Sequence, residues 1–312
     1  MLQFTIKRLG QSIVLILIVT MITFFLMNLA PGGPSSMMRM DATEEERAAI
    51  SEQLGLDDPI PIRYGKWLID AMQGDLGLSL SSGQEVTDRI LERFPFTLQL
   101  TMWTIVLSII FGVLFGIISA TNRNTWKDHT INFGSVIGLS VPSFWLAIMM
   151  ILLFSVQLKW LPSSGVGEGS LLDQFKASIM PVVILSTATL PTIVRFTRSS
   201  MLEVITQNYI RTSRAKGIKE RTVIYSHALR NALIPVISII GVLIPRLLSG
   251  AVIVESVFGW PGMGRLIVEA AQSRDYNLVM GVTVIVTVLV VVCNFIVDII
   301  YSKVDPRVKN MG

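Results

Sequence analysis

Asn208 to Pro235 reads NYIRTSRAKGIKERTVIYSHALRNALIP, and this basic stretch is the point from which the fold can be worked out. It lies between two apolar runs, each long enough to cross a bilayer. A loop this basic beside membrane spans is expected on the cytoplasmic side. We therefore predict a docking surface for a soluble partner, whose action the spans transmit. The stretch contains one acidic residue, Glu220, and six basic residues: Arg211, Arg214, Lys216, Lys219, Arg221 and Arg230.

The composition indicates an integral membrane protein. The chain has 312 residues, of which 51% are hydrophobic and 15% charged, and its mean hydropathy is +0.61. A soluble domain carries about 25% charged residues, so this chain lacks the polar surface that a soluble protein needs. Its only cysteine, Cys293, excludes a disulfide within the chain.

The charge marks membrane topology. A net charge of +4 could suggest a nucleic-acid ligand, but the charges are unevenly placed. Residues 31–95 hold twelve acidic and six basic residues, whereas residues 195–230 hold eight basic residues and two acidic ones. This asymmetry follows the positive-inside rule, and we expect no nucleic acid among the partners.

Apolar runs of about 20 residues predict six membrane-spanning helices, and the fold class is therefore an all-α integral membrane protein. The basic residues of the connecting segments place both chain ends in the cytoplasm. The first apolar run follows Lys7 and Arg8 and is too long for a signal peptide, whose apolar region has about 7–15 residues. The predicted spans are residues 9–29, 96–120, 131–158, 179–196, 232–254 and 278–301.

The spans divide the chain into four parts. Residues 1–30 form the cytoplasmic N-terminal end with the first span, and residues 31–95 an extracytoplasmic helical cap on the outer leaflet. Residues 96–302 form a five-helix core with a cytoplasmic loop at 198–230, and residues 303–312 a cytoplasmic tail. Within the cap, Thr43 is typical of a helix N-cap. Residues 64–72 and 86–94 predict two short amphipathic helices.

The basic loop has an internal order that attraction to anionic lipid headgroups would not require. Residues 209–214 and 221–229 have helical composition, and Gly217 separates them. Glycine permits a left-handed turn there without steric cost. We expect a helix–glycine–helix lever along the membrane surface, ending where Pro235 leads into the fifth span.

The sequence contains no pattern typical of bond chemistry. The only histidines, His129 and His227, fall in different loops without the spacing of a metal site or of a nucleophile and its base. A glycine-rich phosphate loop is also missing from the sequence. We therefore expect no catalytic residue, no metal site and no cofactor bound by this chain.

The basic loop resembles the cytoplasmic coupling loop of ABC importer permeases, and most closely that of their peptide/nickel branch. That branch typically has Tyr-Ile-Arg-Thr-x-Arg-Ala-Lys-Gly followed by His-x-Leu-Arg-Asn-Ala-Leu-Ile-Pro. The general form of the motif matches strictly only at Gly217 and Leu229. Further matches lie along nearly the whole chain, at residues 31–34, 53–57, 195–201, 254–264, 274–276 and 304–307. Within the first of these, Gly33 replaces the more usual Asp.

The resemblance implies a type I importer fold and a transmembrane subunit that carries oligopeptides or dipeptides across the cell membrane. It also implies the partners: a homologous second permease, two cytoplasmic ATPases that hold ATP and Mg²⁺, and an extracytoplasmic binding protein. The residues implied at the ATPase are Tyr209, Arg211, Thr212, Arg214, Ala215, Lys216, Gly217, His227 and Arg230. Arg211 and Arg214 would meet an acidic rim, and Ala215 would allow close approach.

Arg246 follows Pro245 inside the fifth predicted span, where a charge is costly unless it faces water or a partner. One interpretation is that Arg246 lines the translocation path and attracts a peptide carboxylate. The other is that it reaches outward to the interface or pairs with an acid of the second permease.

The segment after the fifth span is a candidate outer gate. Phe258 and Trp260 lie next to three residues that turn the chain, namely Pro261, Gly262 and Gly264. Such a segment suits a re-entrant gate, which is tolerated where it is buried in protein or lines a cavity. An aromatic anchor at the membrane interface is the alternative.

Two other functions compete with peptide import. A nickel or metal-chelate importer shares the motifs, although the predicted outer loops hold no histidine cluster and only Met37, Met38 and Met40 lie together. A stand-alone secondary transporter or channel would be expected to carry carboxylates at the membrane midplane, and the spans contain almost none. A scaffold without transport activity would not explain Arg246, Pro181 or Pro191.

Overall fold

The computed structural model describes residues 2–29, 58–167 and 169–304, and these residues are almost entirely helical. Five helices are long and apolar enough to cross a membrane, and a sharply bent helix pair makes a sixth span if it is counted as one. The predicted fold class is confirmed. The predicted helix start at Thr43 lies outside the described residues, and the four-part division stays a prediction.

The described residues pack as two units, each with its own core. The first unit comprises residues of 1–97 and 261–291, and the second comprises residues of 98–260 and 292–312. Two long helices, α4 (Val86–Thr121) and α13 (Tyr276–Val304), contribute to both units.

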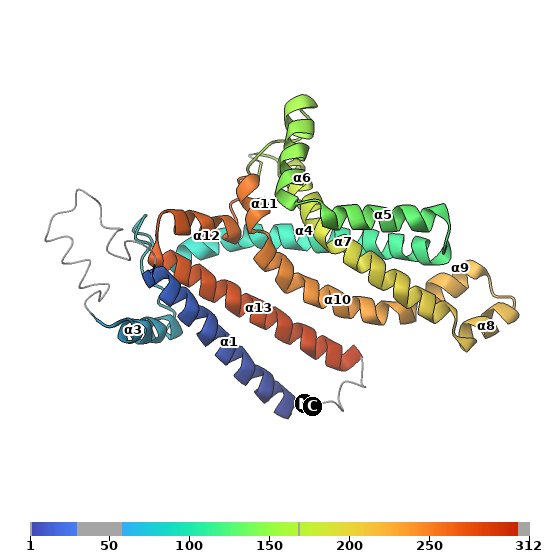
Figure 1. Cartoon of the computed structure of the whole chain (residues 1–312), viewed down its shortest axis with the longest axis horizontal. Helices are drawn as coiled ribbons and strands as arrows, with labels where there is room; N and C mark the ends of the chain where they lie inside the picture. The colour runs from blue at the N-terminus through green and yellow to red at the C-terminus, as the bar shows by residue number, and fades with distance from the viewer. Residues whose placement is uncertain (1, 30–57, 168, 305–312) are drawn as a thin grey trace. The chain divides into compact units, whose positions relative to one another are not determined.

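The first unit packs α3 (Ile60–Met72) against α1 (Leu2–Leu29) through aromatic rings (Figure 1). Phe24 meets Tyr64 edge to face at 5.5 Å between ring centroids and Tyr276 at 6.0 Å. The Tyr64 hydroxyl lies 2.9 Å from Thr20 Oγ1, so its polar end is satisfied inside the apolar contact. The predicted helix at 64–72 is confirmed and begins slightly earlier, at Ile60.

Asp275 fixes the start of α13 and ties it to a serine-rich turn. Its carboxylate accepts hydrogen bonds from the Ser79 and Ser81 hydroxyls, at 2.6 and 2.8 Å, and from the backbone N–H of Leu278 at 3.2 Å. Burial opposes the charge, but these bonds prevail and keep the pKa of Asp275 below its ordinary value. The side chain therefore stays ionised and caps the helix N-terminus.

The helix expected at residues 86–94 is not a separate piece. It is the first part of α4, which runs through Pro95 to Thr121 without interruption. Helix α7 (Leu171–Ile205) is likewise longer than predicted and keeps Pro181 and Pro191 inside it. A capping box between Ser170 and Asp173 starts α7, so residues 171–176 belong to the helix rather than to a loop.

The third predicted span, residues 131–158, is wrong as a single helix. Helix α5 (Trp126–Ser140) ends at Val141, and α6 (Ser143–Met150) begins after Pro142 with a bend of 100°. A π-helical turn, η2 (Ile151–Gln157), continues α6. Val141 has the extended conformation that a following proline imposes, with ψ of 125°.

The fifth predicted span, residues 232–254, is also divided. Helix α10 (Leu229–Gly250) ends at Ala251, and the short α11 (Val252–Val257) follows. The next helices are α12 (Met263–Gln272) and α13.

Two glycines bring α4 and α7 into close contact within the second unit. A Cβ atom on Gly112 would lie 2.7 Å from the Ile193 side chain, and one on Gly116 would lie 2.5 Å from Thr197. Their spacing is the small-xxx-small pattern by which helices approach closely in membranes. The α4–α7 contact therefore depends on the missing side chains.

Replacing Gly116 with alanine should lower the thermal stability of the protein in detergent. Alanine normally favours a helix over glycine by about 1 kcal/mol, but overpacking here costs roughly 1–3 kcal/mol. Gly134→Ala on α5 is the matched control, because nothing lies within 4 Å of the added Cβ. Melting followed by size-exclusion chromatography tests this, and equal melting temperatures for the two variants would contradict it.

Candidate functional site

The basic loop folds as a helical hairpin at the ends of α7 and α10 (Figure 1). Helix α8 (Asn208–Ala215) forms its first arm, and α9 (Glu220–Thr222) with the π-helical turn η3 (Val223–Ala228) forms the second. The first predicted helix is confirmed. The second is continuous with α10, so the loop holds one short independent helix, α8, and an extension of the fifth span.

Gly217 makes the turn that the sequence predicted. Its φ of +74° is left-handed, and its N–H donates to the carbonyl of Arg214 at 2.9 Å. The N–H of Ile218 donates to the carbonyl of Ser213 at 3.4 Å, which completes a Schellman motif. This geometry ends α8 sharply and sends the chain back toward the membrane spans.

Two side-chain contacts brace the hairpin. The Arg214 guanidinium donates to both Glu220 carboxylate oxygens, at 3.1 and 2.6 Å. The Asn231 amide donates to the Tyr209 hydroxyl at 2.8 Å. Sequence reasoning assigned Arg214 to an acidic rim on a partner, whereas in the structure it holds the two arms of its own hairpin together.

The inner face of the hairpin joins a buried apolar cluster, called here the hairpin core. Ile210 is fully buried, with no exposed surface, and contacts side chains from several helices. Because this one core joins residues of five elements, the hairpin cannot move independently of the helices that share it. The hairpin core consists of Ile117 and Ala120 of α4, Met201 of α7, Ile210 of α8, Val223 and Ala228 of η3, and Ala232 of α10.

The outer face presents the residues that the sequence selected. Most of the nine predicted docking residues are exposed, and His227 is half-buried. Charge, a tyrosine ring and the flat surface at Ala215 and Gly217 together make a surface suited to a protein partner. The exposed members are Tyr209, Arg211, Thr212, Arg214, Ala215, Lys216, Gly217 and Arg230.

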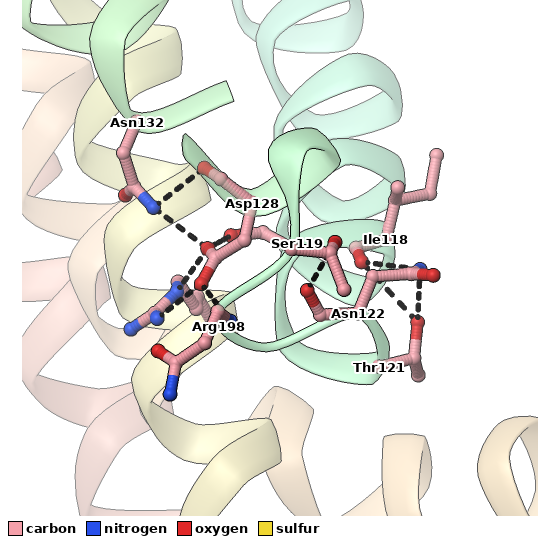
Figure 2. A network of polar contacts seen from close by, with 9 residues as sticks. Ile118, Ser119, Thr121, Asn122, Asp128, Asn132 and Arg198 are labelled. Atoms are coloured by element: carbon pink, nitrogen blue, oxygen red, sulfur yellow. Dashed lines mark hydrogen bonds and ion pairs between the residues drawn. The ribbon is translucent and has the colours of Figure 1, made fainter. Parts of the chain in front are cut away.

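A buried ion pair lies next to the hairpin core, and sequence reasoning missed it (Figure 2). Arg198 of α7 donates from Nε and from its terminal nitrogen to the two Asp128 oxygens, both at 2.8 Å. Asp128 of α5 is only 2% exposed. The carboxylate also accepts hydrogen bonds from the Ser119 hydroxyl, the Asn132 amide and the backbone N–H of Asn124.

This pair is well satisfied despite its burial. A buried carboxylate is stable only when its oxygens are paired and hydrogen-bonded, and five donors from three helices and one turn meet this one. Removing one partner of a fully buried pair costs roughly 3–5 kcal/mol, and the cost here is smaller because the Arg198 side chain is 26% exposed. The available sequence signal was an acid in the first turn of a helix, which by itself indicates only helix capping.

The other predicted residues lie away from the hairpin. Pro245 is buried in α10 and Arg246 is exposed on the same helix, which agrees with both interpretations of Arg246. Phe258 and Trp260 are 2% and 0% exposed, so their rings lie inside the protein, as a gate requires and an interfacial anchor does not. Gly262 and Gly264 are buried as well, and Pro261 is half-buried.

The candidate gate segment, residues 258–264, begins with a second glycine turn. Gly259 has a φ of +59°, and the N–H of Trp260 donates to the carbonyl of Glu255 at 2.8 Å. This turn ends α11 and directs the Trp260 ring inward. Within the described ranges, no group of three or more His, Cys, Asp and Glu side chains could hold a metal ion.

Glu220→Gln should loosen the hairpin without unfolding the spans. An exposed ion pair contributes roughly 0.2–1 kcal/mol, so trypsin should cleave at Lys216 and Lys219 up to about fivefold faster. The matched control is Glu203→Gln, which neutralises an exposed acid near the end of α7. Time courses of digestion, resolved by mass spectrometry, provide the measurement. Identical rates for wild type and Glu220→Gln would show that the pair does not brace the hairpin.

Comparisons with known proteins agree with this arrangement. The oligopeptide transport system permease protein AppB of Bacillus subtilis is 42% identical over 99% of this chain and 100% of that protein. The dipeptide transport system permease protein DppB of Alkalihalophilus pseudofirmus is 37% identical over 99% of this chain and 100% of its own length. A solved inward-facing structure of the MetNI methionine ABC transporter matches with a TM-score of 0.55 and 21% identity, over 69% of this chain and 96% of that chain.

Two family descriptions cover most of the sequence. The N-terminal family of binding-protein-dependent transport system membrane components matches residues 1–101. The second match covers residues 112–310, which include the hairpin, the buried ion pair and the gate segment. The chain therefore belongs to the family of binding-protein-dependent transport system inner membrane components.

Proposed function

We propose that this chain is the transmembrane subunit of an ATP-driven importer that translocates peptides delivered by an extracytoplasmic binding protein. The observation that carries the proposal is the hairpin, which exposes a basic face while Ile210 anchors it in a core shared by five helical elements. The peptide substrate is supported by the names of the relatives, which are oligopeptide and dipeptide permeases.

The proposed complex contains a second, homologous permease and two cytoplasmic ATPases. The ATPases hold ATP and Mg²⁺ and hydrolyse the nucleotide, and this chain is the pore-forming subunit. Both chain ends lie in the cytoplasm, as the positive-inside rule requires for a basic hairpin on that side. The complex lies in the cell membrane.

Coupling requires that the hairpin make different contacts with the open and the closed ATPase pair. ATP binding closes the ATPase pair and draws the hairpins together, which favours the outward-open arrangement of the spans, and hydrolysis releases them. A partner that bound the hairpin equally well in both states would shift nothing. The exposed face of α8 is the surface that changes its contacts, and the hairpin core transmits the movement.

Arg246 and the gate segment belong to the translocation path of the peptide. Arg246 faces outward from α10, between the buried Leu243 and Leu247. In a two-permease complex this surface of α10 lines the translocation path, where the guanidinium attracts the peptide carboxylate. Phe258 and Trp260 close the outer mouth from within the protein.

Gly217→Val should abolish docking of the ATPases. Valine is strongly disfavoured at a φ of +74°, so the turn that ends α8 cannot form. Gly74→Val is the matched control, because Gly74 has a φ of +88° with nothing within 4 Å and lies outside the hairpin. Co-purification of the ATPases with tagged permease is the measurement. Full recovery of the ATPases with Gly217→Val would overturn the docking assignment.

Arg246→Gln should lower ATP-dependent peptide uptake at least about tenfold, since a hydrogen bond to a charged group contributes roughly 1.5–3 kcal/mol. The complex should still assemble. Proteoliposomes holding all subunits should import a free peptide faster than its C-terminal amide, and the variant should lose this preference.

Arg195→Gln, an exposed arginine on α7, is the control for uptake. Unchanged uptake by Arg246→Gln would reject the substrate role of Arg246. Uptake of a nickel chelate in place of every peptide tested would reject the peptide importer itself.

A further inference from the structure

We infer that the Asp128–Arg198 ion pair is a positioning device that makes α5 and the bent α6 follow the movement of the coupling hairpin. The inference rests on the proposed function, because it explains how force applied at the hairpin reaches a helix that the hairpin core does not include. Neither residue contacts a partner or substrate in this role. Each acts through the helix that it holds.

The pair is geometrically suited to hold two helices in one register. A guanidinium and a carboxylate that share two parallel bonds fix orientation as well as distance. Both bonds are 2.8 Å long, and the carboxylate is almost completely removed from solvent. Salt therefore screens the contact far less than it screens the exposed Arg214–Glu220 pair.

Arg198 lies close to the hairpin along α7. It precedes Met201 of the hairpin core by one helical turn, and α7 ends at Ile205, just before α8 begins at Asn208. Seven residues of helix, about 10 Å at 1.5 Å per residue, separate Arg198 from the end of α7. A movement of α8 therefore reaches Arg198 through a short, continuous helix.

Asp128 carries the same movement into α5. The carboxylate lies in the first turn of α5, and Ser119 binds it from the end of α4 (Figure 2). The backbone N–H of Asn124 binds it from the following turn. At the other end of α5, a Cβ on Gly138 would lie 3.4 Å from the carbonyl oxygen of Thr187 in α7. Helix α5 is thus held to α7 at both ends, with the ion pair nearest the hairpin.

The bend after α5 gives this attachment a consequence. Because α6 leaves α5 at 100°, a small rotation of α5 about its cytoplasmic end becomes a lateral displacement of α6. Helix α6 also contacts α7 and α11, and α11 leads into the gate segment. The ion pair therefore lies at the start of a packed connection from the docking face to the gate.

The test uses the whole complex, with both permeases and the ATPases, in nanodiscs. Spin labels replace the exposed Arg123, in the turn before α5, and the exposed Glu203, near the end of α7, in a Cys293→Ser background. When the Asp128–Arg198 ion pair is unaltered, the distance between the two spin labels should have one narrow distribution, both with and without ATP. With Asp128→Asn or Arg198→Gln the distribution should broaden, and peptide import per assembled complex should fall roughly tenfold while ATP hydrolysis continues.

Three matched variants sharpen the result. Arg195→Gln removes an exposed charge one turn before Arg198 and should change neither the distances nor import. Arg198→Lys keeps the charge but loses the paired geometry, and it should be intermediate. The double variant Asp128→Asn/Arg198→Gln should be no worse than the more severe single variant, since the two residues act together.

Several outcomes overturn the inference. The first is a distance between the two spin labels in the wild type that differs with and without ATP. The second is an Asp128→Asn variant whose label distances and peptide import are both unaltered. The third is a variant that assembles in lower yield but whose assembled complexes still couple ATP hydrolysis fully to import. Because the distance measurement needs no substrate, it decides the inference even if the wild-type complex hydrolyses ATP and imports no peptide. That last result would count against the proposed function alone.

Discussion

Inside a bilayer every backbone N–H and C=O must find a partner within the protein, and the whole structure follows from that constraint. The spans are helices because a helix satisfies these groups by itself. Several departures from helical geometry occur where a residue type makes the departure inexpensive. Among the described residues these places include the extended Val141 before Pro142 and the left-handed Gly217 and Gly259.

The same constraint determines how a signal can travel. A rigid helix transmits displacement along its axis, but sideways transmission depends on what packs against it. In the second unit, the lateral contacts include the apolar hairpin core around Ile210, the close approach at Gly112 and Gly116, and the Asp128–Arg198 pair. The hairpin core and the glycine contacts leave no room for the helices to slide independently, and the ion pair fixes the orientation of α5 relative to α7.

The prolines show the limit of local sequence rules. Pro95, Pro181, Pro191, Pro235 and Pro245 all lie inside continuous helices, whereas Pro142 ends one. Each proline removes the same hydrogen bond and restricts the residue before it in the same way. Whether a helix bends gently or breaks depends on the neighbouring helices that can satisfy the freed groups. Those neighbours are distant in sequence, so the break after α5 could not be predicted from residues 131–158.

The sequence by itself determined the membrane class, the approximate positions of the spans, and the basic hairpin with its turn at Gly217. These features depend on composition, on the periodicity of apolar residues and on backbone preferences, which are local properties. The docking role of the exposed hairpin residues stays a prediction. The tertiary structure decided that Arg214 binds Glu220, that the second hairpin arm extends α10, that Trp260 is buried, and that Asp128 meets Arg198. For the last of these the physical reason is distance along the chain: Asp128 and Arg198 are seventy residues apart, and only the packing of α5 on α7 brings their charges together.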